Sequence, residues 1–242
     1  MAKDWIDVDK IKVDLDNFFS TSSADLSKFG STVNQTFEAF VFVSVAKWYI
    51  ARGWTVEPIH PTKVGSASRD LHLKFRTRGK PSAYTYFRCT KRNAEVHVRH
   101  QLRVATKYHQ AANDPPANIC LDVAVVMPVD LSDFSSDDFL ENSLLLTFGE
   151  AKHMSAFAEL IASFIGLVHE LSPQALKRHK TRFTGTRRKA HPAPFLYVSG
   201  FLYRTAAGMK LTIENRGYDI DIYDRVESLI STSELPSKTP AT

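Results

Sequence analysis

The pattern of apolar and polar positions predicts a helix followed by a set of strands in the first half of the chain. Apolar residues recur at helical spacing through NQTFEAFVFVSVAKWYIARG, where Asn34 can cap the helix and Gly53 can end it in a left-handed conformation. Residues 54–59 favour a strand. Period-two alternation in SAYTYFRCT and AEVHVRHQLRVA, on either side of the turn-like KRNA, then predicts a hairpin.

The second half of the chain alternates strands with helices. The expected elements are a buried strand over 118–127, an acidic loop, a strand over 144–152, an apolar-striped helix over 155–171, a strand over 193–203, a helix ending at Gly217, and a closing strand over 218–223. This order predicts an α/β fold with a mixed β-sheet flanked by helices. We expect parallel pairing late in the chain, where helices separate the strands.

Length and composition favour one main domain. The chain has 242 residues and is 43% hydrophobic, enough to build a sizeable core. We expect this domain to span residues 33–231, after an N-terminal extension of a short helix and a Ser-rich loop over 1–32. Residues 232–242 are expected to form a disordered tail.

Charge and cysteine content narrow the function classes. The 31 Lys and Arg exceed the 26 Asp and Glu, a formal charge of +5 that favours polyanionic partners. Two cysteines, Cys89 and Cys120, are too few for a disulfide framework or a four-cysteine zinc site. The start MAKDWIDVDK is too acidic for a signal peptide, and no apolar run approaches the ~20 residues that span a bilayer. We therefore expect a cytoplasmic protein with no membrane partner.

Acidic side chains occur where a core does not require them. The apolar strand ending at residue 152 carries Glu150 and Lys152, which alternation places on the same face. Asp122 interrupts the preceding buried strand, and Glu38 lies in the first helix. A buried charge is costly unless it is paired or binds a metal. Carboxylates on neighbouring strands can share a hard divalent cation such as Mg²⁺.

This arrangement resembles the PD-(D/E)XK nuclease superfamily, whose members share the restriction-endonuclease-like fold. The resemblance covers the order of elements over residues 33–224. Asp122 matches the strand aspartate, Glu150 and Lys152 match the acid-x-lysine, and Glu38 matches the glutamate of the first helix. The residue before Asp122 is Leu121, where many members have proline. The resemblance implies a nuclease that hydrolyses phosphodiester bonds, an endonuclease acting on DNA rather than RNA, in restriction or antiviral defence.

The resemblance also implies a role for each site residue. Asp122, Glu150 and the carbonyl of Ala151 would hold Mg²⁺, with Mn²⁺ as a substitute, to activate water and neutralise the phosphate. Lys152 would orient the attacking water and stabilise charge on the phosphate, and Glu38 would assist. Two further acids are candidates. Asp70 is the second choice, after Asp122, for the strand aspartate, and Glu159 could face the site from the next helix.

A basic run follows the predicted 155–171 helix and is a candidate for gripping nucleic acid. Its cations are Lys177, Arg178, Lys180, Arg182, Arg187, Arg188 and Lys189. Such segments contact the phosphate backbone without reading sequence. Lys91, Arg92, Arg99 and Arg103 on the hairpin could extend the same surface. A solvated loop is the alternative.

Several alternatives remain open at this level. Glu150 and Lys152 could be ordinary surface charges where a strand emerges into solvent. The chain could be a catalytically inactive nucleic-acid-binding or assembly module with the same fold, and a homodimer or larger assembly is compatible with it. His97 and His100 fall on opposite faces of a strand, which argues against a shared metal site.

Overall fold

The computed structural model describes residue 13 and residues 33–61, 72–75, 78–109, 115–177 and 190–224. The helices are α2 (Val33–Ile50), α3 (Ala158–Leu171) and α4 (Arg204–Arg216), with short 3-10 turns at Pro81–Ala83, Asn142–Leu144 and Pro173–Leu176. The strands are β1 (Thr55–Ile59), β2 (Tyr86–Lys91), β3 (Ala94–Ala105), β4 (Asn118–Val126), β5 (Leu145–Lys152), β6 (Phe195–Val198) and β7 (Asp221–Asp224).

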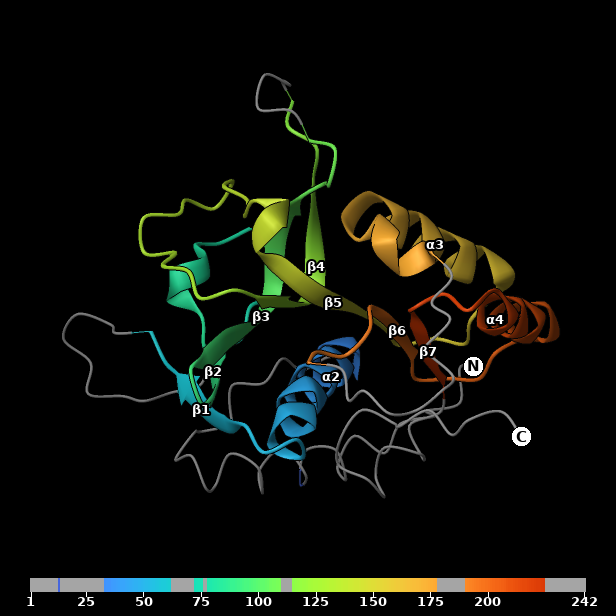
Figure 1. Cartoon of the computed structure of the whole chain (residues 1–242), viewed down its shortest axis with the longest axis horizontal. Helices are drawn as coiled ribbons and strands as arrows, with labels where there is room; N and C mark the ends of the chain where they lie inside the picture. The colour runs from blue at the N-terminus through green and yellow to red at the C-terminus, as the bar shows by residue number, and fades with distance from the viewer. Residues whose placement is uncertain are drawn as a thin grey trace.

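The seven strands form one sheet in the order of the sequence (Figure 1). Strands β1 to β5 pair antiparallel, and β5, β6 and β7 pair parallel. The two parallel connections contain α3 and α4, because a parallel pair needs a long crossover. The predicted α/β fold with a mixed sheet and late parallel pairing is confirmed.

Helix α2 is buried around most of its circumference. Twelve of its 18 residues are buried, and all of these except Thr36 and Ser44 pack with β-sheet residues such as Val98 and Tyr197 into one hydrophobic core. The helix ends as predicted: Gly53 has a φ of 75°, and the Trp54 N–H donates to the Tyr49 carbonyl at 3.1 Å. The start differs from the prediction, because Asn34 lies within the helix rather than capping it.

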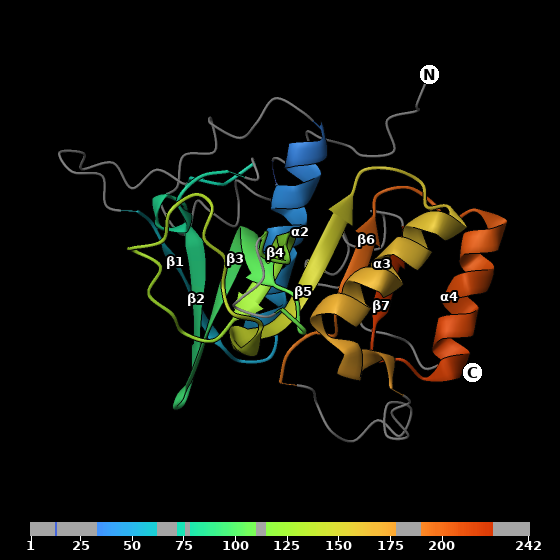
Figure 2. The ribbon, with the colours of Figure 1, turned by 90° about the horizontal axis from the view of Figure 1, so that it is seen from above.

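Helices α3 and α4 cover the opposite face of the sheet from α2 (Figures 1 and 2). In α3 the buried residues are Ile161, Phe164, Val168 and Leu171, an apolar stripe at helical spacing. They form a second core with Phe148 and other residues of the sheet. The central strands β4, β5 and β6 are therefore packed on both faces of the sheet.

The observed boundaries of the hairpin and of β6 can be compared with the boundaries that the alternation pattern predicted. The hairpin turns through the two residues between Lys91 and Ala94, with Arg92 at a left-handed φ of 54°. Strand β6 is shorter than expected, because its pairing ends at Val198. The chain leaves the sheet at Gly200, where an added Cβ would lie 2.5 Å from the Ser155 hydroxyl.

Three predictions fall wholly or partly outside the described residues. The extension over 1–32 is undescribed except for residue 13, and the tail over 232–242 and residues 178–189 of the basic run are not described. No helix within the described ranges is long and apolar enough to cross a membrane.

Candidate active site

The candidate site lies where β4 and β5 stop pairing. The last pair toward the start of β4 joins Val123 to Gly149, so the two strands are no longer paired at Asp122 and Glu150. The Asp122 side chain fills the opening and accepts a hydrogen bond from the Ala151 N–H at 2.9 Å. A carboxylate thus takes the place of a backbone acceptor from the neighbouring strand.

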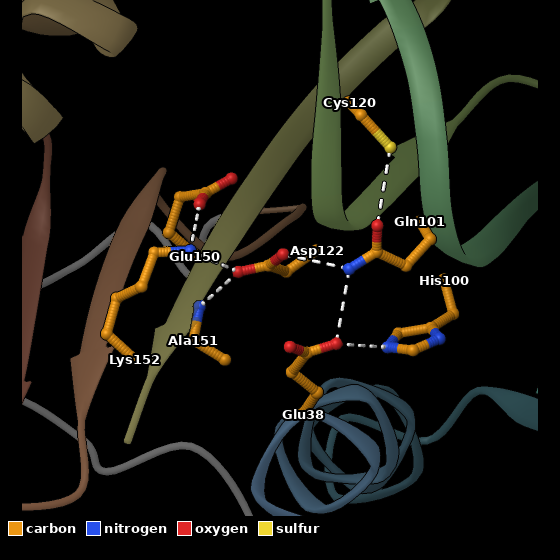
Figure 3. A network of polar contacts seen from close by, with 8 residues as sticks. All are labelled: Glu38, His100, Gln101, Cys120, Asp122, Glu150, Ala151 and Lys152. Atoms are coloured by element: carbon orange, nitrogen blue, oxygen red, sulfur yellow. Dashed lines mark hydrogen bonds and ion pairs between the residues drawn. The ribbon is translucent and has the colours of Figure 1, made fainter. Parts of the chain in front are cut away.

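Lys152 joins the two predicted carboxylates. Its Nζ lies 2.8 Å from Asp122 Oδ2 and 2.8 Å from Glu150 Oε2 (Figure 3). The acid side chains are only 10% and 12% exposed, whereas the lysine side chain is 37% exposed. These groups are therefore not surface charges at a strand end, and that alternative is wrong.

Glu38 reaches the same site through an intermediary. Gln101 of β3 donates from Nε2 to Glu38 Oε2 at 3.1 Å and to Asp122 Oδ1 at 3.0 Å. One amide group therefore links the helix carboxylate to the strand carboxylate (Figure 3). His100 Nε2 lies 3.6 Å from the same Glu38 oxygen. All four predicted catalytic residues, Glu38, Asp122, Glu150 and Lys152, belong to one polar network.

At Gln101 the alternation of β3 side chains between the two faces of the sheet is interrupted. Val98 belongs to the core under α2, whereas Leu102 belongs to the core under α3 and α4, although regular alternation would put both on one face. Leu121 and Val123 make the same change on β4. Gln101 has a φ of 53°, uncommon for a residue other than glycine. This local conformation places its amide between the two carboxylates.

Glu150 has a buried carboxylate oxygen that the network leaves unsatisfied. Its Oε1 is buried with no hydrogen-bond partner. Burial, together with the neighbouring Asp122 charge, raises the pKa of Glu150 to about 7. Burial alone lowers the pKa of Lys152, but the carboxylates of Glu150 and Asp122 outweigh it and raise that pKa above its usual value. The metal-free site thus holds a cationic lysine beside a carboxyl group that retains its proton more readily than an exposed one.

The residues present offer two carboxylates to a cation. Within the described part of the chain, no group of three or more His, Cys, Asp or Glu side chains is arranged to hold a metal. A backbone oxygen is available as a further ligand: in a strand the N–H and C=O of one residue point to the same edge, so the Ala151 carbonyl faces the same side as its N–H, toward Asp122.

Sequence reasoning missed the residues that connect the acids. Gln101, His100 and Cys120 carry no signal of their own, and only the pairing of β3 with β4 brings them to the site. The Cys120 thiol donates to Gln101 Oε1 at 3.3 Å. Burial raises the pKa of that thiol, while the nearby cations Lys74 and Arg103 oppose the rise. Positive charge therefore lies next to the acidic network.

Two of the other sequence candidates are described and exposed. Glu159 is exposed in the first turn of α3, and Lys177 is exposed after the turn that follows α3. Asp70 lies outside the described residues, as do Arg178, Lys180, Arg182, Arg187, Arg188 and Lys189. Arg99 is only 6% exposed, so it does not extend an exposed basic face of the hairpin as predicted.

The structure explains why residue 149 is a glycine, which the sequence alone did not. A Cβ at this position would lie 2.0 Å from the ring of Phe195 on β6. The glycine therefore gives the Phe195 ring room to pack against β5, directly before Glu150.

No protein-family model matches the chain, and comparisons with curated proteins and with solved structures found no match. The function is therefore argued from the site itself.

Proposed function

We propose that this protein is a metal-dependent nuclease of restriction-endonuclease-like fold that hydrolyses phosphodiester bonds, with DNA as its substrate. One observation carries the proposal: the buried Asp122 and the largely buried Glu150, whose side chain is 12% exposed, both lie 2.8 Å from Lys152 where two strands diverge. Perturbed, largely buried acids beside a specific charge partner cluster at functional sites, which supports this assignment.

The donor set fits a hard divalent cation such as Mg²⁺, with Mn²⁺ as a substitute. Asp122 and Glu150 offer carboxylate oxygens, one of which, Glu150 Oε1, has no partner and is buried. The Ala151 carbonyl is the backbone ligand. When bound, the cation would neutralise the scissile phosphate and make a water molecule more acidic.

Each side chain then has a distinct task. Asp122 and Glu150 would hold the cation, and Lys152 would donate hydrogen bonds to the attacking water and the phosphate oxygens. Glu38 orients the Gln101 amide, which keeps Asp122 in position. Lys74 and Arg103 add positive charge beside the acids, which favours an approaching phosphate.

The order of elements also supports this proposal. Helix α2, the antiparallel strands β3, β4 and β5, helix α3 and the parallel strand β6 follow the succession that the resemblance implies, and the acids lie on the expected elements. The formal charge of +5 suits a polyanionic substrate.

A nucleic-acid-binding module without turnover is the second candidate. The observation that favours it is the position of Lys152, which already neutralises both carboxylates without any metal. In that case the network would be a buried ion cluster that specifies the fold.

Cleavage assays separate the two candidates. Purified protein should cut plasmid or linear DNA with Mg²⁺ or Mn²⁺ and stop in excess EDTA. Lys152→Met should lower turnover by at least about 100-fold while DNA binding survives, because the lysine acts mainly in the transition state. Lys107→Met, at an exposed lysine in the turn after β3, should cut like the wild type. Equal cleavage by Lys152→Met, or cleavage in EDTA, would contradict the proposal.

A further inference from the structure

A second cleft lies on the β1–β3 part of the sheet and shares no residue with the acidic network. Its volume is about 550 Å³. Strands β2 and β3 form one wall, with Tyr86, His97 and Arg99, and the segment 128–132 after β4 forms another. Clefts of this size accommodate small-molecule ligands.

Arg99 is the unusual residue of this cleft. It is only 6% exposed, and its guanidinium lies 4.0 Å from the centroid of the Tyr86 ring. Its Nε is buried without a hydrogen-bond partner, and it forms no ion pair with any residue in the described ranges. A buried guanidinium without a carboxylate partner destabilises the folded state. A cleft that contains such a guanidinium is therefore a candidate anion-binding site.

The other charged side chains that line the cleft are already engaged. Arg88 pairs with Glu57 at 2.6 Å, and His97 Nε2 lies 2.9 Å from Glu95. Burial lowers the pKa of His97, which favours its neutral form at neutral pH. Among the described residues, Arg99 is therefore the cation of this wall that has no carboxylate within ion-pair distance, while Glu95 and Asp130 place negative charge in the same cleft.

One acid opposes that charge without pairing with it. The Asp130 carboxylate accepts a hydrogen bond from the Ser132 N–H at 2.9 Å, and its charge acts on Arg99 from a distance. Because it remains bound to its own turn, Asp130 leaves the guanidinium open to a ligand, but its charge weakens the attraction for an anion.

We propose that this cleft binds a phosphate group of a ligand of nucleotide size, with the phosphate on the Arg99 guanidinium. The planar guanidinium presents a fork of N–H donors that matches phosphate oxygens. The volume is larger than a phosphate alone requires, and the hydroxyls of Ser82 and Ser132 and the ring of Tyr84 offer contacts for a sugar and a base. A free nucleotide and the phosphorylated end of a nucleic-acid strand share this chemistry. The proposal does not depend on nuclease activity.

Titration calorimetry in EDTA tests the proposal on the full chain. Adenosine 5′-monophosphate should bind with saturation, and adenosine should bind at least about 10-fold more weakly, because it lacks the group that pairs with Arg99. A short oligonucleotide with and without a 5′-phosphate distinguishes the two sources: preference for the phosphorylated strand over the mononucleotide assigns the site to strand ends, and the reverse to free nucleotides. No binding of either at millimolar concentration, or equal binding of nucleoside and nucleotide, overturns the proposal.

Variants locate the binding. Arg99→Gln should weaken nucleotide binding at least about 10-fold, whereas Arg204→Gln, the same charge change at the exposed start of α4, should not. Asp130→Asn should tighten binding severalfold, because an opposing charge is removed while an acceptor for Ser132 remains. If Arg99→Gln does not fold, Ser132→Trp at the exposed rim serves as the second variant and should block the cleft. Wild-type affinity in Arg99→Gln or Ser132→Trp, or no change in Asp130→Asn, contradicts the proposal.

Discussion

At the scale of single residues, the site is a balance of buried charges. Two carboxylates lie close together in a largely buried position, and Lys152 offsets their repulsion. The offset is incomplete, because the pKa of Glu150 still rises to about 7. Burial is the larger cause of this rise, and the negative charge of Asp122 is the second. A group that holds its proton in the folded state and releases it in the unfolded state makes stability depend on pH.

The dependence predicted for Glu150 has a definite sign. Its pKa is raised on folding from 4.5 to about 7. Below pH 4.5 both states carry the proton. Between pH 4.5 and about 7 the unfolded chain releases it first, so the stability of the wild type in EDTA should fall, relative to Glu150→Gln, by up to roughly 3 kcal/mol. Chemical denaturation across this range measures the difference.

The control for this measurement is Glu159→Gln, which changes an exposed glutamate in α3. Its stability should follow the wild-type pH profile closely, because an exposed carboxylate has a similar pKa in both states. If the stability of the wild type and of Glu150→Gln changed with pH in the same way, folding would not raise the pKa of Glu150.

Removal of the Lys152 charge should expose the repulsion between the acids. Lys152→Met keeps most of the side-chain volume but leaves Asp122 and Glu150 without a cation, so the melting temperature in EDTA should fall. Mn²⁺ should then raise the melting temperature more in Lys152→Met than in the wild type, because the ammonium no longer competes with it.

Lys210→Met, which breaks a partly buried pair with Asp224, provides the comparison. It should also lower the melting temperature, but Mn²⁺ should have the same effect on it as on the wild type. An equal effect of Mn²⁺ on Lys152→Met and Lys210→Met would argue against a cation site at the acids.

At the scale of elements, the site depends on the place where β4 and β5 separate. Gly149 forms the last pair with Val123, and the ring of Phe195 occupies the space where its side chain would be. The packing of β6 against β5 therefore holds the segment that carries Glu150 and Lys152. A change at Gly149 should disturb stability and site geometry together.

Gly149→Ala should destabilise the protein by about 1–3 kcal/mol, because its Cβ would overlap Phe195 in a packed core. Phe195→Leu in the same chain should recover part of the loss by shortening the opposing side chain. Gly166→Ala is the matched control: its Cβ meets nothing within 4 Å on α3, and it should stabilise by up to about 1 kcal/mol. Denaturant titration measures all three. A Gly149→Ala variant as stable as the wild type would contradict this account of the glycine.

At the scale of the whole molecule, affinity for nucleic acid should depend on the summed positive charge and on where it lies. The basic run over 177–189 is a prediction from sequence that lies, beyond Lys177, outside the described residues. If it grips phosphates, Arg187→Ala, Arg188→Ala and Lys189→Ala combined should weaken DNA binding equally across sequences. The slope of log affinity against log salt should become shallower by roughly 2–3.

A second triple variant separates this local effect from net charge. Lys107→Ala, Arg204→Ala and Arg216→Ala combined remove the same charge from exposed positions away from the basic run. Fluorescence anisotropy at several salt concentrations should show a smaller change in its slope. Equal slopes for the two variants would leave the basic run as a solvated loop.

Local pattern was sufficient for most of the fold and for part of the site. Alternation located the hairpin and the buried strands, and Gly53 ended the first helix as expected, because these features depend on neighbours in sequence. The same period of two placed Glu150 and Lys152 on one side of β5. The exact ends of β6 and β7 were missed, since they depend on pairing with other strands.

Tertiary structure decided what these residues meet. The register of β3 against β4 brings Gln101 beside Asp122, and the divergence of β4 from β5 brings Asp122 to Lys152. The same register buries Arg99 in a cleft instead of exposing it on the hairpin. Strand register and strand divergence are set by contacts between segments far apart in the chain. The pattern within one strand therefore determines which side a residue faces, but not which residue lies opposite.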